Sequence, residues 1–372
     1  MEEPSITFFP VENGDTSLLC LSDGTTILID CHICENALYD TPTHLLDTLK
    51  HVDGVPHVGV FMLTHPHEDH ALGLQSICYF GDPAKYSAED KKKSLIVIDE
   101  LWFAPRIFND QNKDMCDDAR AFKKEAERRM DLYRSGNQTR ANVGNRLRLI
   151  GATDNDDCNE LDEITTVPGE TLNLINGKRF DDFRFFVFAP VKKDSDDDSI
   201  GPNNTSIVLQ ARFDIDGEEE AVRAFFGGDA ECPVWERIVD RNEDENLAFD
   251  LLLAPHHCSW TVFNADGGDE PSEKVLHLLD QRRVGTNVIA SSKAIKDDDD
   301  NPPSYRAKKV YVDAVGTDHF LCTGEHPNEK DPKPIHFTLS KNGLTKSRFT
   351  RSYNQSTVAV LSQTTSSPRT YG

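Results

Sequence analysis

Residues 64–70, THPHEDH, gather three histidines and two acids directly after an apolar run, VGVFML. Along an extended chain His65 and His67 point the same way, and a turn after them brings Asp69 and His70 towards the same point. Imidazole nitrogen and carboxylate oxygen are both ligands for zinc. The spacing therefore predicts two adjacent metal-binding points, the first made by His65 and His67 and the second by Asp69 and His70.

Two later strand ends carry the same kinds of side chain. FFGGDA (225–230) is an apolar strand that ends in glycines and then Asp229, so the backbone can bend and the carboxylate can face outwards. LLLAPHHCS (251–259) is another apolar strand, and it ends in His256 and His257. A carboxylate between two cations can bridge them, and a further imidazole can complete the shell of the second ion.

Strands and helices must deliver these groups to one place. SITFFPV, TSLLCL and TTILID predict a meander of three short strands, and further strands are predicted at VGVFML, SLIVIDELWF, DDFRFFVFAP, SIVLQARF, AVRAFF and FDLLLAP. Helices are predicted at 41–52 with Thr43 as the cap, from about Ala71, at 117–134 and at 233–239.

Composition and charge favour a cytoplasmic protein. The chain has 372 residues, a net charge of -24 and a pI near 4.9, which opposes binding to anionic membranes or bulk nucleic acid. No apolar run approaches the roughly 20 residues that cross a bilayer, and the N-terminal MEEPSITFFP lacks the pattern of a secretory signal. The odd count of 9 cysteines predicts reduced thiols, with the CxxC pair Cys31 and Cys34 in a structural role.

A single domain is expected over 1–362, followed by a polar flexible tail at 363–372. Within it, 82–151 is less regular and is interpreted as a partly helical insertion. Segment 120–150 has nine basic residues against three acids, a local charge of +6. Such a segment would draw phosphate to the metals if it lay over them, whereas the alternative is a solvated helix face that balances acids elsewhere.

Taken in order, these stretches resemble the metallo-β-lactamase superfamily and, within it, the ComEC-type branch of competence-protein-like hydrolases. The resemblance runs from about residue 5 to residue 345 through NGDTSLL, ILIDCH, THPHEDHALGL, NNTSIVLQARF, FFGGDAE and LLLAPHHCS. It implies an α/β fold, a four-layer αββα sandwich with the metals at one edge. It also implies phosphodiester chemistry, including nuclease activity.

The resemblance carries roles over to single residues. The first ligand cluster is matched by His65, His67, Asp69 and His70. Asp229 matches the bridging aspartate, and Asp30 matches an aspartate that orients the histidine loop by hydrogen bonds. The last histidine is His256 or His257; we prefer His256 because it comes first off the strand, but the sequence does not separate the two.

The chain departs from the family pattern in mid-chain, where NNTS, with Asn203, Asn204 and Ser206, replaces a histidine ligand. Water or a hydroxyl would then complete the shell of the first ion, which weakens its affinity or favours manganese over zinc. HHCS stands in place of HHGS, with Cys258 replacing the glycine and Ser259 retained. NPP (301–303) stands where a glycine–histidine–proline is expected.

The function predicted is a hydrolase with two Zn²⁺ or Mn²⁺ ions, a phosphodiesterase or nuclease that uses a hydroxide bridging the ions. Asp69 would hold that hydroxide and pass a proton to the leaving group, while Ser259 and Lys293 are candidate contacts for an anionic substrate, nucleic acid or nucleotide. The alternatives are hydrolysis of a lactone or thioester, and a non-catalytic interaction module. The sequence leaves the oligomeric state open.

Overall fold

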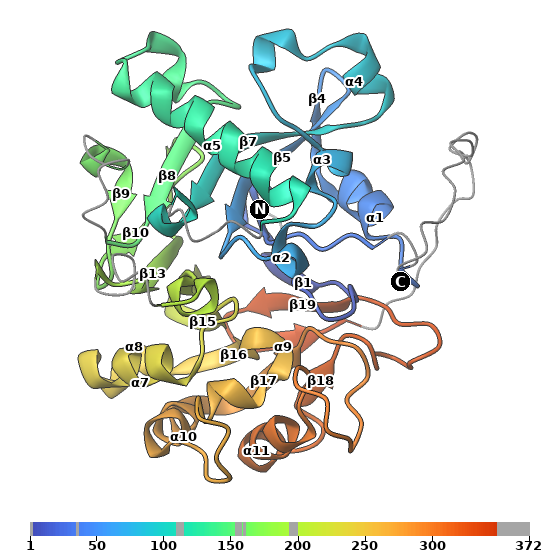
Figure 1. The fold of residues 1–372 in the computed structure, drawn as a ribbon, viewed down its shortest axis with the longest axis vertical. Helices are drawn as coiled ribbons and strands as arrows, with labels where there is room; N and C mark the ends of the chain where they lie inside the picture. The colour runs from blue at the N-terminus through green and yellow to red at the C-terminus, as the bar shows by residue number, and fades with distance from the viewer. Residues whose placement is uncertain are drawn as a thin grey trace, which may run out of the picture.

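A computed structural model describes residues 3–34, 37–108, 115–152, 158, 161–192 and 200–347. Two large β-sheets face each other in its centre (Figure 1). The predicted tail and most of the charge run KKDSDDDS lie outside the described residues.

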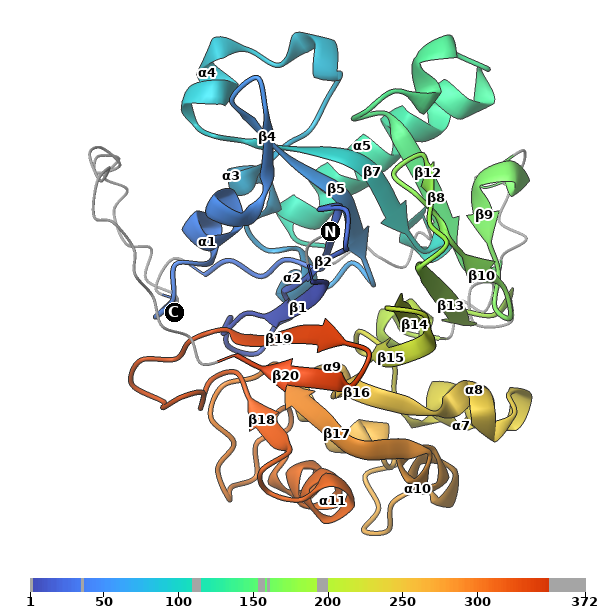
Figure 2. The same ribbon diagram turned by 180° about the vertical axis from the view of Figure 1, so that it is seen from behind.

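The larger sheet begins with the predicted meander. Its main path runs β20 (Gly343–Lys346), β19 (Ile335–Ser340), β1 (Ser5–Phe8), β2 (Ser17–Cys20), β3 (Thr26–Ile29), β5 (Val55–Leu63), β7 (Ile96–Phe103), β8 (Arg146–Ile150) and β9 (Thr165–Thr166), with β4 (Lys50–Val52) on β5 and β6 (Cys78–Tyr79) on β7. From behind, the C-terminal strands β19 and β20 lie beside the N-terminal β1 (Figure 2).

The smaller sheet is formed by the middle and later parts of the chain. Its order is β10 (Thr171–Leu172), β13 (Phe183–Ala189), β14 (Val208–Ile215), β15 (Glu218–Phe226), β16 (Phe249–Leu253), β17 (Arg282–Ala290) and β18 (Phe320–Cys322). A separate ribbon pairs β11 (Leu174–Ile175) with β12 (Lys178–Arg179). Strands β15, β16, β17 and β18 run parallel, so their carboxyl ends meet at one edge.

Helices cover the outer face of each sheet. The larger sheet carries α1 (Thr41–Thr48), α2 (Glu68–Ala71), α3 (Leu74–Ile77), α4 (Ala88–Lys92) and α5 (Asp117–Arg134), and the smaller sheet carries α7 (Cys232–Arg241), α8 (Asp244–Leu247), α9 (Pro255–Cys258), α10 (Glu273–Asp280) and α11 (Tyr305–Val315) (Figure 1). Short 3-10 turns are η1 (Pro83–Lys85), η2 (Pro105–Phe108), η3 (Gln138–Ala141), η5 (Asp162–Ile164), η6 (Pro202–Thr205) and η7 (Trp260–Val262).

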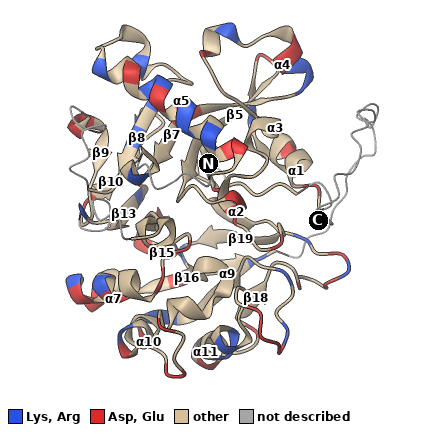
Figure 3. Ribbon diagram, in the orientation of Figure 1, with Lys and Arg blue, Asp and Glu red and all other residues tan. Residues whose placement is uncertain are grey.

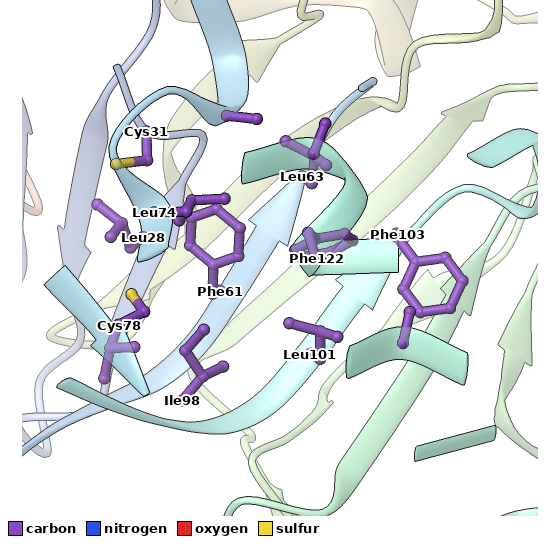
Figure 4. Close-up of a cluster of buried hydrophobic side chains, with 14 of the residues drawn as sticks. Leu28, Cys31, Phe61, Leu63, Leu74, Cys78, Ile98, Leu101, Phe103 and Phe122 are labelled. Atoms are coloured by element: carbon purple, nitrogen blue, oxygen red, sulfur yellow. The ribbon is translucent and has the colours of Figure 1, made fainter. Parts of the chain in front are cut away.

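Three hydrophobic cores separate these layers. Alternation along β5 sends Val60 and Met62 into the core between the sheets and Phe61 and Leu63 into the core under α5, where Phe122 packs (Figure 4). A third core joins the smaller sheet to α7, α10 and α11. The order helix, sheet, sheet, helix confirms the predicted αββα fold class.

Several details differ from the sequence predictions. The helix predicted over 41–52 ends at Thr48, because residues 50–52 pair with β5 as β4. Its N-terminal cap is Asp40, whose side chain accepts from the backbone N–H of Thr43, the residue predicted as the cap. The stretch 82–151, interpreted as an insertion, contributes β7 and β8 to the larger sheet. Every residue of β7 and all of β8 except its first residue are buried, so this part of the stretch belongs to the core.

Candidate metal centre

The candidate ligands lie where strands of both sheets end. The loop after β5 carries His65, His67, Asp69 and His70, and α2 begins within that loop. Asp229 follows β15, and His257 follows β16 in the short α9. Two groups of side chains in the described residues have ligand atoms that all lie within 4.8 Å of one another: His65, His67, Asp69 and Asp229; and Asp69, His70, Asp229 and His257.

Asp30 holds the loop of residues 64–70 in place through hydrogen bonds to Thr64 and His70. One carboxylate oxygen accepts a hydrogen bond from the backbone N–H of Thr64 at 2.7 Å, and the other accepts from the Thr64 hydroxyl at 2.7 Å. The second oxygen also lies 2.8 Å from Nδ1 of His70. Because Asp30 is fully buried, these bonds hold both the loop and the ring of His70 in place.

The two glycines after β15 let Asp229 reach that loop. Gly228 has φ +48, and a Cβ built on it would lie 2.7 Å from Oγ1 of Thr64. Only glycine therefore allows this close approach. The backbone N–H of Asp229 then donates to Oγ of Ser206 at 3.2 Å, so the predicted mid-chain Ser206 helps to place Asp229.

The carboxylate of Asp229 lies in the middle of the histidines. Its Oδ1 atom lies 2.9 Å from Nε2 of His70 and 3.5 Å from Nε2 of His257. Its Oδ2 atom lies 3.5 Å from Nε2 of His65 and 3.7 Å from Nε2 of His256. A tetrahedral ion with bonds of about 2.0–2.1 Å spaces its ligand atoms roughly 3.3 Å apart, so these separations suit bound cations.

Four of these atoms are buried and make no hydrogen bond of acceptable geometry. They are His65 Nε2, His70 Nε2, His257 Nε2 and Asp229 Oδ1. An unsatisfied buried polar atom is costly, and here four such atoms lie in the two groups of ligands that share Asp229. Divalent cations in the two groups would satisfy all four, so the side chains present fit the metals that the sequence predicts.

The electrostatics of the cluster also favour a cation. Burial alone would lower the pKa of His70, but Asp229 and Asp30 raise it well above its usual value. Burial likewise opposes the charge of His257, yet Asp229 raises its pKa to about 10. Burial would raise the pKa of Asp229 itself, and the neighbouring imidazoles, led by His70, hold it well below its usual range. The carboxylates thus create a field that attracts positive charge.

A third group of potential ligands, Asp15, Asp30 and His70, also lies within 4.8 Å. His70 takes part in it through Nδ1, which contacts Asp30, whereas its Nε2 faces Asp229. Asp15 lies 3.5 Å from Nδ1 of His257 and its backbone N–H donates to the carbonyl of Asp69. We interpret this layer as the outer support of the ligands.

The predicted choice of His256 as the last ligand of the second ion does not fit the geometry. His257 lies 3.3 Å from Oδ2 of Asp69 through Nε2, and it belongs to the second group of ligand atoms. His256 lies 3.7 Å from the other oxygen of Asp229 through Nε2, and it belongs to neither group of ligand atoms. The two residues both have positive φ, so the turn sends neighbouring side chains to different positions around Asp229.

The two predicted substrate contacts, Ser259 and Lys293, each have partners within the protein. Ser259 is fully buried, and its hydroxyl bonds to Asn301 and Thr261. Lys293 is exposed, and its ammonium group pairs with Asp300 at 2.7 Å. Asn204 contacts no ligand group directly; its side chain holds Glu231. Among the candidate ligands, His67, His256 and Asp69, whose side chain is 35% accessible, are half-buried, and the others are buried.

Sequence reasoning missed Asp15, Thr64 and Glu231. Thr64 and Glu231 stand within two residues of predicted ligands, and Asp15 follows the NG turn near the N-terminus. Gly14 beside it allows a tight contact, because a Cβ there would lie 2.7 Å from the carbonyl oxygen of Asp69. The signal in the sequence that could have identified these three residues is their position near the ends of predicted strands.

Several arginines of the basic segment 120–150 pair with acidic or carbonyl groups of the protein itself. Arg128 and Arg129 both pair with Glu125 at 2.7 Å, and Arg146 donates to the carbonyl of Asn176 at 2.9 Å. Acidic and basic residues alternate along α5 (Figure 3). The end of α5 beside α3 is acidic, where Asp118 accepts from Gly73 and Gln75, so the observed arrangement favours the solvated, charge-balanced interpretation.

Among the described residues, no helix is long and apolar enough to cross a membrane. No protein-family model and no curated protein sequence matches the chain. One similar solved structure is that of a protein from Parabacteroides distasonis ATCC 8503 named as a candidate metal-dependent hydrolase; it has 13% sequence identity and a TM-score of 0.35, and the match covers 86% of this chain and 92% of that one. Another is a long-form RNase Z from yeast, with 12% identity and a TM-score of 0.38, where the match covers 90% of this chain and 42% of that one.

Proposed function

We propose that this protein is a hydrolase with two divalent metal ions, of the metallo-β-lactamase type, and that its substrate is a phosphodiester. The observation that carries the proposal is the set of buried, unsatisfied imidazole and carboxylate atoms around Asp229. Such atoms have no structural reason to remain unpaired, whereas each would be satisfied as a metal ligand.

Two divalent ions bound there would lower the pKa of water towards neutrality and stabilise the negative charge that develops during displacement. The protein side chains supply the rest. Asp229 sets the spacing of the two sites, since each of its oxygens faces a different pair of imidazoles. Asp30 keeps His70 oriented, with its Nδ1 atom engaged and its Nε2 atom facing the site.

Asp69 is the residue best placed to move a proton. Its side chain is the most exposed of the candidate acids, and it lies between the two groups of ligands. Burial would raise the pKa of Asp69, but His257 and His70 keep it well below its usual value, so it remains a carboxylate at neutral pH. It can accept a proton from attacking water and return it to a leaving group.

Charge balance supports an anionic substrate at the centre itself. Two divalent cations would carry four positive charges against the two carboxylates of Asp69 and Asp229, which leaves a positive site for phosphoryl oxygens. The net charge of -24 and the internal pairing of segment 120–150 argue against a long nucleic-acid groove. We therefore favour a nucleotide or another small phosphodiester over duplex DNA or RNA.

A neutral ester, such as a lactone or thioester, is the second candidate. The observation that favours it is the lack of an available cation at the predicted contact, because Lys293 is paired with Asp300. A neutral substrate needs no such cation and would use the same metal centre. The phosphodiester remains our first choice because the positive centre would bind its oxygens more strongly.

The test is a substrate panel with the full-length protein loaded with Zn²⁺ or Mn²⁺. The panel holds an aryl phosphodiester, a cyclic dinucleotide, single-stranded DNA, an aryl lactone and an acyl thioester. We expect turnover of the small phosphodiesters, and loss of that turnover in the double variant Asp69→Ala, His70→Ala. The variant Asp331→Ala, which changes an exposed acid far along the chain, is the matched control.

Turnover confined to the lactone or thioester would replace the phosphodiester by the second candidate. A protein that binds two ions per chain yet cleaves none of the five compounds would support the non-catalytic module. A protein that binds no divalent ion would contradict the proposal as a whole. Metal content is measured by mass spectrometry on the protein before and after dialysis against a chelator.

A further inference from the structure

We propose that Asp15 positions His257 for metal binding, and that the second group of ligands is therefore the tighter of the two metal sites. The second group is Asp69, His70, Asp229 and His257, and the first group is His65, His67, Asp69 and Asp229. This inference rests on the proposed two-metal hydrolase. It adds which site fills first and which residue decides the order.

The carboxylate of Asp15 is buried beside His257. Only 4% of its side chain is accessible, and its Oδ1 atom lies 3.5 Å from Nδ1 of His257. That oxygen makes no hydrogen bond of acceptable geometry, although a buried carboxylate oxygen without one is costly. A shorter contact with the Nδ1–H group of His257 would satisfy this oxygen.

The surroundings of His257 also determine which of its ring nitrogens can bind metal. Nδ1 lies 3.1 Å from the carbonyl oxygen of Ser291 and 3.5 Å from the carboxylate of Asp15, and both of these groups are acceptors. The hydrogen of the neutral ring is therefore assigned to Nδ1, which leaves the lone pair on Nε2. Nε2 faces the ligand atoms, at 3.3 Å from Asp69 and 3.5 Å from Asp229. Asp15 thus favours the tautomer in which His257 is a ligand.

Backbone contacts hold Asp15 beside the metal centre. Its N–H donates to the carbonyl oxygen of Asp69 at 3.1 Å, and the carbonyl oxygen of Gly14 accepts from the hydroxyl of Ser291 at 2.6 Å. These two bonds join the N-terminal turn to the loop of residues 64–70 and to the end of β17. Because they use the backbone of the turn, the turn keeps its place when the side chain of Asp15 is changed.

His70, the other imidazole of the second group, has the same kind of partner. Its Nδ1 atom lies 2.8 Å from Asp30, and its Nε2 atom lies 2.9 Å from Asp229. Ligand atoms of Asp15, Asp30 and His70 all lie within 4.8 Å of one another. Two carboxylates therefore lie behind the imidazoles of the second group, and each makes its imidazole a more basic ligand.

The first group differs in both respects. Among the described residues, its imidazoles form no ion pair through Nδ1. Nδ1 of His65 lies 3.3 Å from the hydroxyl of Thr64, which is a neutral group and itself donates to Asp30. The first group has two half-buried members, His67 and Asp69, whereas the second group has only Asp69. An ion in the first group would therefore be more open to water and held by a weaker electrostatic attraction.

The consequence is an order of loading. Because both groups share Asp69 and Asp229, the difference between them comes from the imidazoles and from the carboxylates behind these. We therefore expect the first equivalent of zinc to enter the second group and the next equivalent to enter the first group. The metal-dependent activity would then follow the occupancy of the weaker site.

The experiment titrates zinc into the full-length, metal-free protein labelled with ¹⁵N-histidine and follows the side-chain resonances of the ligand histidines. Substitution of each of these histidines by glutamine, one at a time, assigns its resonance, and competition with a chromophoric chelator gives the stepwise affinities. The test variant is Asp15→Asn, which keeps the shape of the side chain and removes its charge. The matched control is Asp47→Asn, the same change at an exposed aspartate of α1. Thermal melting of the metal-free proteins is followed by circular dichroism.

In the wild type we expect the resonances of His70 and His257 to shift with the first equivalent of zinc, and those of the first group's own histidines to shift with the second. Asp15→Asn should weaken the tighter site roughly 10–100-fold and change the weaker site less than about threefold. The metal-free variant should melt no lower than the metal-free wild type, because it loses a buried charge with an unsatisfied oxygen. Asp47→Asn should match the wild type in affinity and in melting.

Zinc that enters the first group before the second, or both groups together, would overturn the inference and leave the two-metal site intact. Wild-type affinity in Asp15→Asn together with a lower melting temperature would give Asp15 a purely structural role, which also contradicts the inference. A protein that binds a single zinc ion, in the second group, would support the inference and contradict the proposed two-metal hydrolase. A protein that binds no zinc would contradict both.

Discussion

The metal centre and the basic segment 120–150 both concentrate ionisable side chains, but the two regions differ in how those side chains are paired. In the basic segment several charges have partners close in sequence, as Arg128 and Arg129 do with Glu125 three and four residues earlier. In the metal centre the groups come from distant strand ends, such as Asp30 with His70 and His65 with Asp229, and several of their buried atoms stay unsatisfied. Unsatisfied burial, rather than density of charge, therefore identifies the functional region.

The largest expected effect comes from the centre of the metal cluster. Asp229→Ala removes a buried carboxylate that belongs to both groups of ligands, so we expect the loss of at least one ion and a fall in kcat/KM of roughly 10³-fold or more, about 4 kcal/mol of transition-state stabilisation. Metal content and turnover of the aryl phosphodiester measure the two effects. Wild-type turnover in this variant would place the active centre elsewhere.

The basic segment should respond in stability instead of activity. Arg129 is buried, and it pairs with Glu125 and donates to the carbonyl of Ile98, so Arg129→Ala removes one of the two arginines that pair with this buried carboxylate and also leaves the buried carbonyl without its donor. We expect the free energy of unfolding to fall by about 3–5 kcal/mol, with the activity of the folded fraction unchanged. Urea titration measures this.

The matched change is Arg120→Ala, because Arg120 forms an exposed pair with Asp117. It should cost less than about 1 kcal/mol. Equal losses of stability in the two variants would mean that burial does not distinguish the two pairs, and the proposed structural role of Arg129 would then fail.

Asp30 tests the outer support of the metal centre. Asp30→Asn keeps the shape of the side chain but removes the charge beside Nδ1 of His70 and weakens the bonds to Thr64. We expect metal affinity to fall roughly 10–100-fold, as for other residues that orient ligands. Calorimetric titration gives the affinity, and unchanged binding would limit Asp30 to a purely structural role.

The variant Lys124→Glu tests whether the basic segment guides an anionic substrate towards the metal centre. Its side chain is exposed on α5. Electrostatic guidance changes association rates about 10-fold or more, whereas we expect Lys124→Glu to change kcat/KM for a dinucleotide less than about twofold at low salt. A several-fold decrease that disappears at high salt would restore the guidance hypothesis.

The last prediction concerns His336, a histidine outside the centre, whose pKa is lowered whereas those of His70 and His257 are raised. Burial lowers the pKa of His336, which contacts Thr7, below its usual 6.5. The unfolded chain therefore binds more protons than the folded one below that pH, so this residue's contribution to stability is lost as the pH falls towards the folded pKa.

His336→Gln should flatten the decline of the free energy of unfolding between pH 7 and 5, by at most about 1.4 kcal/mol per pH unit. Urea titrations at a series of pH values give the slope. A slope equal to that of the wild type would show that His336 titrates alike in the folded and unfolded chains.

Local patterns in the sequence were enough for most of the elements. The meander at the N-terminus and the helix over 117–134 are confirmed at those positions, because alternation and helical periodicity are short-range properties. The interpretation of 82–151 as an insertion does not hold for β7 and β8, which belong to the larger sheet. The sequence pattern of an apolar strand is the same whether the strand extends the main sheet or lies in an insertion.

The sequence by itself determined which types of side chain stand at the strand ends, and hence that a metal site was to be expected. Only the tertiary structure decided that His257 rather than His256 joins Asp69, that Ser259 is buried, and that Glu231 supports His256. The reason is physical: the direction of a side chain after a strand depends on the φ and ψ of a few turn residues, and distant segments of the chain fix those angles.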